Sequence, residues 1–229
     1  MISGDRHQRR LLYGRTVGHP LSSRQRALIE TVGTACAVPE TGSLTRERLF
    51  GQQITGLHLE IGFGAGEHLA HEASRAPDTG FIGAEPFLNG YAKMLGTIEE
   101  HNLTNVRLHH GDARDILERL AQESLDRVDL LYPDPWPKRR HRKRRFVGPD
   151  TLDQLAQALR PGGLFRFASD IADYTAWTLR HVLADSRFHW TAQQADDWRV
   201  PWPGWPSTRY EAKAIREGRV PAYLVFRRL

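Results

Sequence analysis

The sequence has little cysteine, no long apolar segment and little excess charge outside one short stretch. Cys36 is the single cysteine among 229 residues, which excludes an internal disulfide framework and a cysteine-rich zinc site. No segment approaches the roughly 20 apolar residues that a membrane-spanning helix requires. The basic first residues also lack the apolar core of a signal peptide. We therefore expect a cytoplasmic protein with one main domain and no membrane segment.

Positive charge is concentrated in one segment. Residues 138–145 read KRRHRKRR and hold seven Lys or Arg. The formal net charge of the whole chain is +5, so the remainder carries −2 (5 minus 7). Such a local cationic patch is typical of proteins that bind polyphosphates, including nucleic acids. The same run of basic residues is also consistent with a solvated surface loop or a nuclear-import-like signal.

Alternating strand and helix patterns begin at residue 57. Apolar runs predict strands at 57–61, 80–85, 106–110, 128–132, 164–168 and 222–228. Helical patterns occupy 67–75, the stretch to about 101, 113–122, 151–160 and 170–185, and the proline and glycines at 161–163 are expected to end the fourth of them. This order predicts an α/β fold with a mostly parallel sheet and helices on both faces. Ligands of such sheets bind at the carboxyl ends of the strands.

A glycine-rich turn follows the first predicted strand. Gly62 and Gly64 allow a ligand to approach the backbone closely. A dinucleotide-binding fingerprint would need a third glycine where Glu67 stands. Glu60 precedes the turn, and a carboxylate there suits the amino and sulfonium groups of S-adenosylmethionine but repels a pyrophosphate. The turn therefore favours a site for S-adenosylmethionine over the NAD site of an oxidoreductase.

Two more acids end the next two predicted strands. Glu85 stands where an acid accepts hydrogen bonds from ribose hydroxyls, and Asp112 is placed to meet the adenine amino group. Asp112 could equally cap the helix that follows it. Three acids that each end a consecutive strand are harder to explain as caps, and together they predict a methyltransferase cofactor site.

The segment after the fourth predicted strand reads YPDPWPK over residues 132–138. Its three alternating prolines fix backbone angles, so we expect a stiff, extended support for Asp134. A ring nitrogen such as guanine N7 carries a lone pair and no proton, so no base would be needed to methylate it. The reaction makes the purine cationic, and a carboxylate nearby would stabilise the growing charge. The alternative is a rigid turn without a chemical role.

These motifs together resemble one family. EIGFGAGEHL, AEPF, YPDPWPKRRHRKRR, FASDIADY and STRYEAKAIREG occur in order over residues 55–229, and they are similar to motifs of the bacterial tRNA (guanine-N7-)-methyltransferases of the TrmB type. The resemblance implies a Rossmann-like class I methyltransferase domain at 51–229 with a seven-stranded sheet. Residues 1–50, which are rich in Arg and turn residues, are expected to form a basic, partly flexible arm before it. The resemblance also implies methyl transfer from S-adenosylmethionine to N7 of guanine 46 in the variable loop of tRNA.

The resemblance also assigns roles to residues. It implies that the cofactor is bound by Glu60, Gly62, Gly64, Glu85, Asp112 and Asp134, with Asp134 also catalytic. It implies that the substrate is bound by Lys138, Asp170, Thr208, Arg209, Tyr210 and Glu211. Asp170 can instead cap a helix, and Thr208 and Glu211 have the spacing of a capping box. Trp198, Trp202 and Trp205 provide either a base-stacking surface or buried packing.

Other functions stay open at this point. The acceptor could be another RNA or a protein, and a noncatalytic RNA-binding module is an alternative of a different class. The eleven histidines include His68 and His71 on one predicted helix, but no third ligand accompanies them at a useful spacing. We therefore expect no metal, and a monomer or homodimer with tRNA as its partner.

Overall fold

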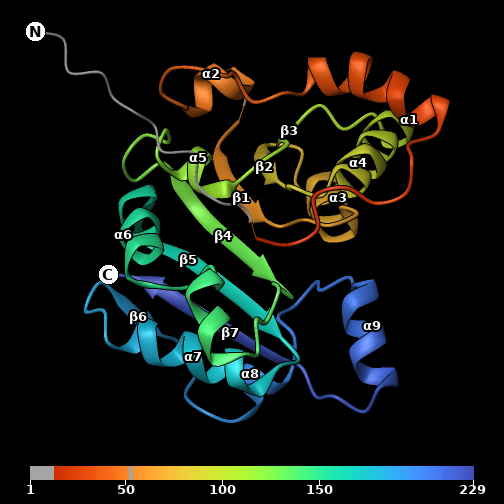
Figure 1. Ribbon diagram of the computed structural model, residues 1–229. Coiled ribbons are helices and arrows are strands. Elements are labelled where there is room, and N and C mark those ends of the chain that lie inside the picture. Colours follow the sequence, from red (N-terminus) through yellow and green to blue (C-terminus); the bar gives the residue numbers. More distant parts are fainter. Residues whose placement is uncertain (1–12, 52–53) are drawn as a thin grey trace, which may run out of the picture.

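The computed structural model describes residues 13–51 and 54–229, with a seven-stranded sheet at its centre (Figure 1). The strands are β1 Gly56–Ile61, β2 Thr79–Ala84, β3 Val106–His109, β4 Leu125–Leu131, β5 Leu159–Ser169, β6 Phe188–Trp190 and β7 Ala222–Arg228. Their order in the sheet is β3-β2-β1-β4-β5-β7-β6. β1 to β5 pair in parallel, whereas β7 is antiparallel to β5 and β6. The predicted α/β class and mostly parallel sheet are confirmed.

Helices cover both faces of the sheet. Those after β1 are α3 Glu67–Arg75, α4 Leu88–His101, α5 Ala113–Leu117, the 3₁₀ helix η2 Arg139–Arg144, α6 Pro149–Ala158, α7 Ala172–Leu183, α8 Asp196–Arg199 and α9 Arg209–Arg216. Phe81 and Ile82 are neighbours in β2, so their side chains point to opposite faces. Phe81 packs in a cluster with buried residues of α3 and α4, and Ile82 in a cluster with buried residues of α5, α6 and α7.

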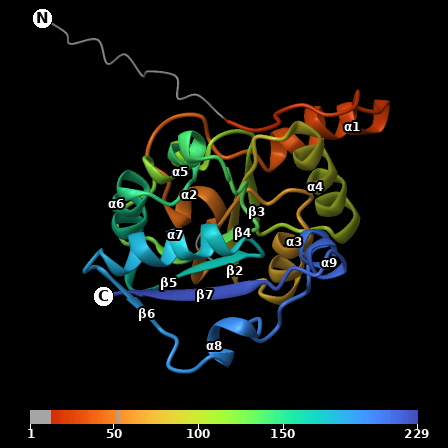
Figure 2. The ribbon, with the colours of Figure 1, turned by 60° about the horizontal axis from the view of Figure 1, so that its bottom comes forward.

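The described part of the N-terminal segment packs against this domain. It contains α1 Ser23–Leu28, the π helix η1 Ile29–Gly33 and α2 Arg46–Phe50. Leu28 and Leu44 are buried, and α1 lies beside α4 in both ribbon views (Figures 1 and 2). Ala37 and Leu44 form isolated bridges with Leu108 and Leu120. Residues 1–12 of the expected arm lie outside the described residues.

Two predicted element boundaries are wrong. α5 ends at Leu117 and not near residue 122, because Leu44 pairs with the backbone of Arg119 and Ala121 and draws the chain out of the helix. β5 begins at Leu159 and runs through the proline and glycines at 161–163. A shift in the β4–β5 register accommodates these residues.

The three-residue strand β6 was not predicted. It is too short for an alternating pattern to stand out, and its pairing with β7 comes from tertiary contact. No helix within the described residues has the length and hydropathy to cross a membrane.

Candidate active site

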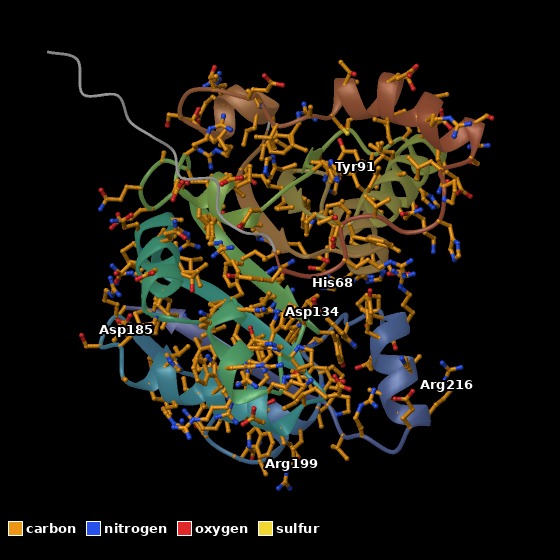
Figure 3. All side chains as sticks on the ribbon, viewed as in Figure 1. His68, Tyr91, Asp134, Asp185, Arg199 and Arg216 are labelled. Atoms are coloured by element: carbon orange, nitrogen blue, oxygen red, sulfur yellow. The ribbon has the colours of Figure 1, made fainter. Side chains whose placement is uncertain are left out.

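A pocket of about 410 Å³ lies at the carboxyl ends of β1, β2 and β4. It brings together five of the six residues expected to bind the cofactor, namely Gly62, Gly64, Glu85, Asp112 and Asp134. Figure 3 labels Asp134 near the tip of β4. The sheet ladder fixes this arrangement, because the backbone N–H groups of Gly62 and Glu85 continue it by donating to Ala84 and His109 at 2.8 and 3.0 Å.

The glycine-rich turn needs its glycines. Gly62, Gly64 and Gly66 have φ angles of 71°, 59° and 83°, a left-handed region that other residues enter at a cost. A Cβ atom on Gly62 would meet nothing within 4 Å, so its backbone faces open space. A Cβ atom on Gly90 would collide with the Gly64 carbonyl, which shows how closely α4 supports the turn.

Glu85 and Asp112 line the pocket while they hold the local backbone. The Glu85 carboxylate accepts hydrogen bonds from Gly64 N at 2.6 Å and Phe87 N at 2.8 Å, and burial raises its pKa. Asp112 caps α5 by accepting from Arg114 N at 3.0 Å, and it pairs with the Arg114 guanidinium at 2.6 Å. Asp112 therefore combines the predicted cap with a place in the pocket.

Glu60 lies apart from the described pocket lining. Its buried carboxylate contacts His68 Nδ1 at 2.6 Å, and burial raises its pKa. Leu59 and Ile61 point into the cluster on the α5 and α6 side, so Glu60 points to the opposite face, toward α3. It ties β1 to α3 beneath the glycine-rich turn.

The segment that carries Asp134 is bent where an extended conformation was predicted. Tyr132 and Trp136 have φ angles of 49° and 43°, and bulky residues adopt such angles at a cost of about 1–3 kcal/mol each. The prolines alone do not set these angles, which is why the prediction was wrong. Two strained aromatic residues thus flank Asp134, two positions before and two after.

Asp134 has a carboxylate that is unsatisfied among the described residues. It forms no hydrogen bond or ion pair with the described residues. Its side chain is open to solvent through the pocket mouth, yet partial burial of the carboxyl in the pocket raises its pKa. A carboxylate that none of the described residues binds is available to a ligand that carries or develops positive charge.

A strap formed by residues 13–18 was not predicted from the sequence. Its first four residues line the same pocket, and a Cβ atom on Gly14 would lie 3.0 Å from Asp134 Oδ2. Thr16 O accepts from Leu88 N at 2.8 Å, and Gly18 N donates to Asn89 at 2.7 Å, which anchors the strap to α4. Only its basic character was visible in the sequence, because an extended strap has no periodic apolar pattern.

The residues expected to bind substrate do not all share the pocket. Tyr210 lines it, and Arg209 lies near Glu67 with an N–O distance of 3.6 Å. Thr208 caps α9 by accepting from Glu211 N at 3.2 Å. α9 itself lies beyond the tips of β4 and β5 in Figure 1.

Glu211 is buried in an aromatic hydrogen-bond cluster. Its carboxylate accepts from Trp205 Nε1 at 2.9 and 2.8 Å, from Tyr132 at 3.4 Å and from Tyr223. Trp202 also packs against Trp205 and Tyr223. Of the two interpretations of these tryptophans, the structure therefore supports packing for Trp202 and Trp205, which are both partly buried.

The basic segment divides into structural and exposed side chains. Arg145 is buried, pairs with Asp173 and lies over the Tyr174 ring at 4.8 Å. Arg142 also pairs with Asp173, at 2.8 Å. By contrast, Lys138, Arg139, Arg140 and Lys143 are exposed. Asp170, which was expected to bind substrate, pairs with Arg219.

The pocket fits the cofactor predicted from the sequence. The open backbone at Gly62 leaves room for a ligand, and each Glu85 oxygen keeps a lone pair for a hydroxyl donor. The volume of about 410 Å³ lies in the usual range for ligand sites. Within the described residues, no group of three or more His, Cys, Asp or Glu is arranged to hold a metal.

Solved structures share this fold. The 16S rRNA methyltransferase KamB superposes with a TM-score of 0.56 at 15% identity and covers 84% of this chain and 98% of its own. The aminoglycoside resistance methyltransferase NpmB1 gives a TM-score of 0.53 at 17% identity, with coverages of 82% and 95%. The fold is thus the Rossmann-like class I methyltransferase fold.

Sequence comparison gives the family. A family model described as "Putative methyltransferase" matches residues 55–223. The tRNA (guanine-N(7)-)-methyltransferase of Rhizobium meliloti (strain 1021) is 53% identical over 220 residues, which cover 94% of each chain. That of Azorhizobium caulinodans is 55% identical over 218 residues and covers 95% of this chain and 94% of the relative. The chain therefore belongs to the tRNA (guanine-N(7)-)-methyltransferase family.

Proposed function

We propose that this protein transfers a methyl group from S-adenosylmethionine to N7 of guanine 46 in the variable loop of tRNA, in the cytoplasm. The observation that carries the proposal is the carboxylate of Asp134, which is unpaired among the described residues and lies in a pocket that also contains Glu85 and Asp112. The names of the relatives support tRNA as the substrate and N7 as the acceptor atom.

The residues at and near the strand ends each have a role in the proposed reaction. When bound, S-adenosylmethionine supplies an electrophilic methyl group on a cationic sulfur. Glu85 accepts hydrogen bonds from the ribose hydroxyls, and Asp112 lies within the same pocket for the adenine. Gly62 lets the ligand lie against the backbone. Glu60 acts indirectly, by holding β1 and α3 together beneath the turn.

Asp134 faces the acceptor base. N7 of guanine attacks with its own lone pair, so Asp134 removes no proton and its charge acts on the purine that becomes cationic. Positioning of the two reactants contributes most of the remaining rate enhancement. The exposed cations of residues 138–143 lie next in the chain and hold the phosphates that flank the target nucleotide.

Labelled S-adenosylmethionine tests the proposal. The protein should label a tRNA transcript, and nuclease mapping should place the label as 7-methylguanine at position 46. A matched transcript with adenine at that position should stay unlabelled. Label at another nucleotide would replace the proposed target. Label on protein alone, or none in the presence of bound cofactor, would refute the proposed activity.

A further inference from the structure

A cation lies on two aromatic rings beside Asp134. The Arg144 guanidinium carbon is 4.4 Å from the centre of the Tyr13 ring and 4.9 Å from the centre of the Trp136 ring. All four side chains line the same pocket. The two ring centres are 6.3 Å apart with an interplanar angle of 75°. Tyr13 and Trp136 thus form an aromatic corner, and a planar cation occupies it.

Arg144 is held there without an acidic partner among the described residues. It forms no ion pair with the described residues, and its buried Nε has no hydrogen-bond partner. Its neighbours Arg142 and Arg145 both pair with Asp173. Attraction between the guanidinium and the ring faces therefore stabilises the Arg144 side chain in this position. The side chain can leave for a phosphate without breaking an ion pair to any described residue.

We propose that the aromatic corner of Tyr13 and Trp136 receives the target purine and stabilises it as a cation, a place that Arg144 fills in the free protein. The proposal rests on the proposed function and identifies further residues that contact the reacting base. The strap carries one wall of the corner, and the segment with the strained φ at Trp136 carries the other. Both walls lie within the pocket that contains Asp134.

The charge balance of the reaction explains why a cation site belongs here. The guanine N7 lone pair forms the new N–C bond while the methyl–sulfur bond breaks, and sulfur keeps that electron pair. The positive charge thus moves from sulfur to the purine ring, and no proton is released from N7. A planar, delocalised purine cation resembles the guanidinium that it replaces, and aromatic faces attract both.

A pair of isosteric tRNAs measures this charge preference directly. One carries 7-methylguanine at the target position, and the other carries 7-methyl-7-deazaguanine, which has the same shape but is neutral. Binding of both is measured at slightly acidic pH, where the methylated purine keeps its N1 proton. The wild-type protein should bind the cationic tRNA at least about fivefold more tightly, because a cation–π attraction of about 1–2 kcal/mol alone gives about fivefold to thirtyfold and the Asp134 carboxylate attracts the same charge.

Variants assign the preference to the rings. Tyr13 is 40% exposed, so Tyr13→Leu removes a ring without emptying the core. Tyr13→Leu and Trp136→Leu should each lower the affinity ratio at least about threefold, whereas Tyr13→Phe keeps the ring and should keep the ratio. Because both tRNAs are measured on the same variant, a general loss of tRNA affinity cancels from the ratio.

Two outcomes would overturn the proposal. One is equal binding of the two tRNAs by the wild-type protein, and the other is an unchanged ratio in both Leu variants. Methyl transfer to unmodified tRNA is measured on the same wild-type preparation. Transfer to N7 without a ring-dependent charge preference refutes the aromatic corner alone, whereas absence of transfer refutes the proposed function.

Discussion

Replacement of Asp134 by Asn should slow methyl transfer without harming the fold. Asn keeps the size of the side chain, and Asp134 has no partner among the described residues that the change would leave unsatisfied. Two unit charges about 4 Å apart interact by about 4 kcal/mol at an effective dielectric constant of 20. With about half of the charge developed in the transition state, the loss is about 2 kcal/mol, or roughly thirtyfold, and up to about 1000-fold in a drier pocket.

Single-turnover methyl transfer to tRNA, with the enzyme and S-adenosylmethionine in excess, measures this effect. The wild-type rate should rise with pH through the raised pKa of Asp134, because the ionised carboxylate alone stabilises the purine cation. Asp134→Asn should lack that rise and should keep the wild-type free energy of unfolding within about 0.5 kcal/mol. A variant rate within about twofold of wild type would refute the electrostatic role.

Three further predictions concern the turn, the basic segment and the aromatic cluster. Arg145→Met should lower the free energy of unfolding by about 1–3 kcal/mol in denaturant titrations. The exposed control Arg139→Met should leave the free energy of unfolding unchanged and weaken tRNA binding. In that control the slope of the logarithm of the tRNA binding constant against the logarithm of the salt concentration should be smaller in magnitude by about 0.7–0.9. Lower stability in Arg139→Met together with unchanged stability in Arg145→Met would contradict the division of the basic segment into structural and exposed side chains. Glu211→Gln should lower stability by about 1–3 kcal/mol and keep the tRNA affinity within about twofold; a large affinity loss at unchanged stability would instead indicate direct contact. Gly62→Ala should weaken S-adenosylmethionine binding at least about tenfold in calorimetry, and unchanged affinity would place the ligand elsewhere.

The strand-end acids could be predicted because their positions follow from local pattern. Glu85, Asp112 and Asp134 each come directly after or close to an apolar run, and parallel strands bring such ends to one edge. Glu60 shows the limit of that reasoning. It lies within β1, where alternation sends its side chain to the α3 face, toward His68.

The rest of the site depends on tertiary contacts that no local pattern records. The strap at residues 13–18 joins the pocket through hydrogen bonds to α4, about 70 residues away in the chain. Glu211 has the spacing of a capping box, but the nearby aromatic donors draw its carboxylate away from the cap. The left-handed angles at Tyr132 and Trp136 are likewise set by their surroundings.

The most direct test of the central claim is the 7-methylguanine content of tRNA from cells that lack this protein. The tRNA variable loop should lose 7-methylguanine, wild-type protein should restore it, and Asp134→Asn expressed at the same level should restore little. Full 7-methylguanine in the deletion strain, or full restoration by Asp134→Asn, would contradict the assignment of this pocket and its carboxylate to guanine methylation.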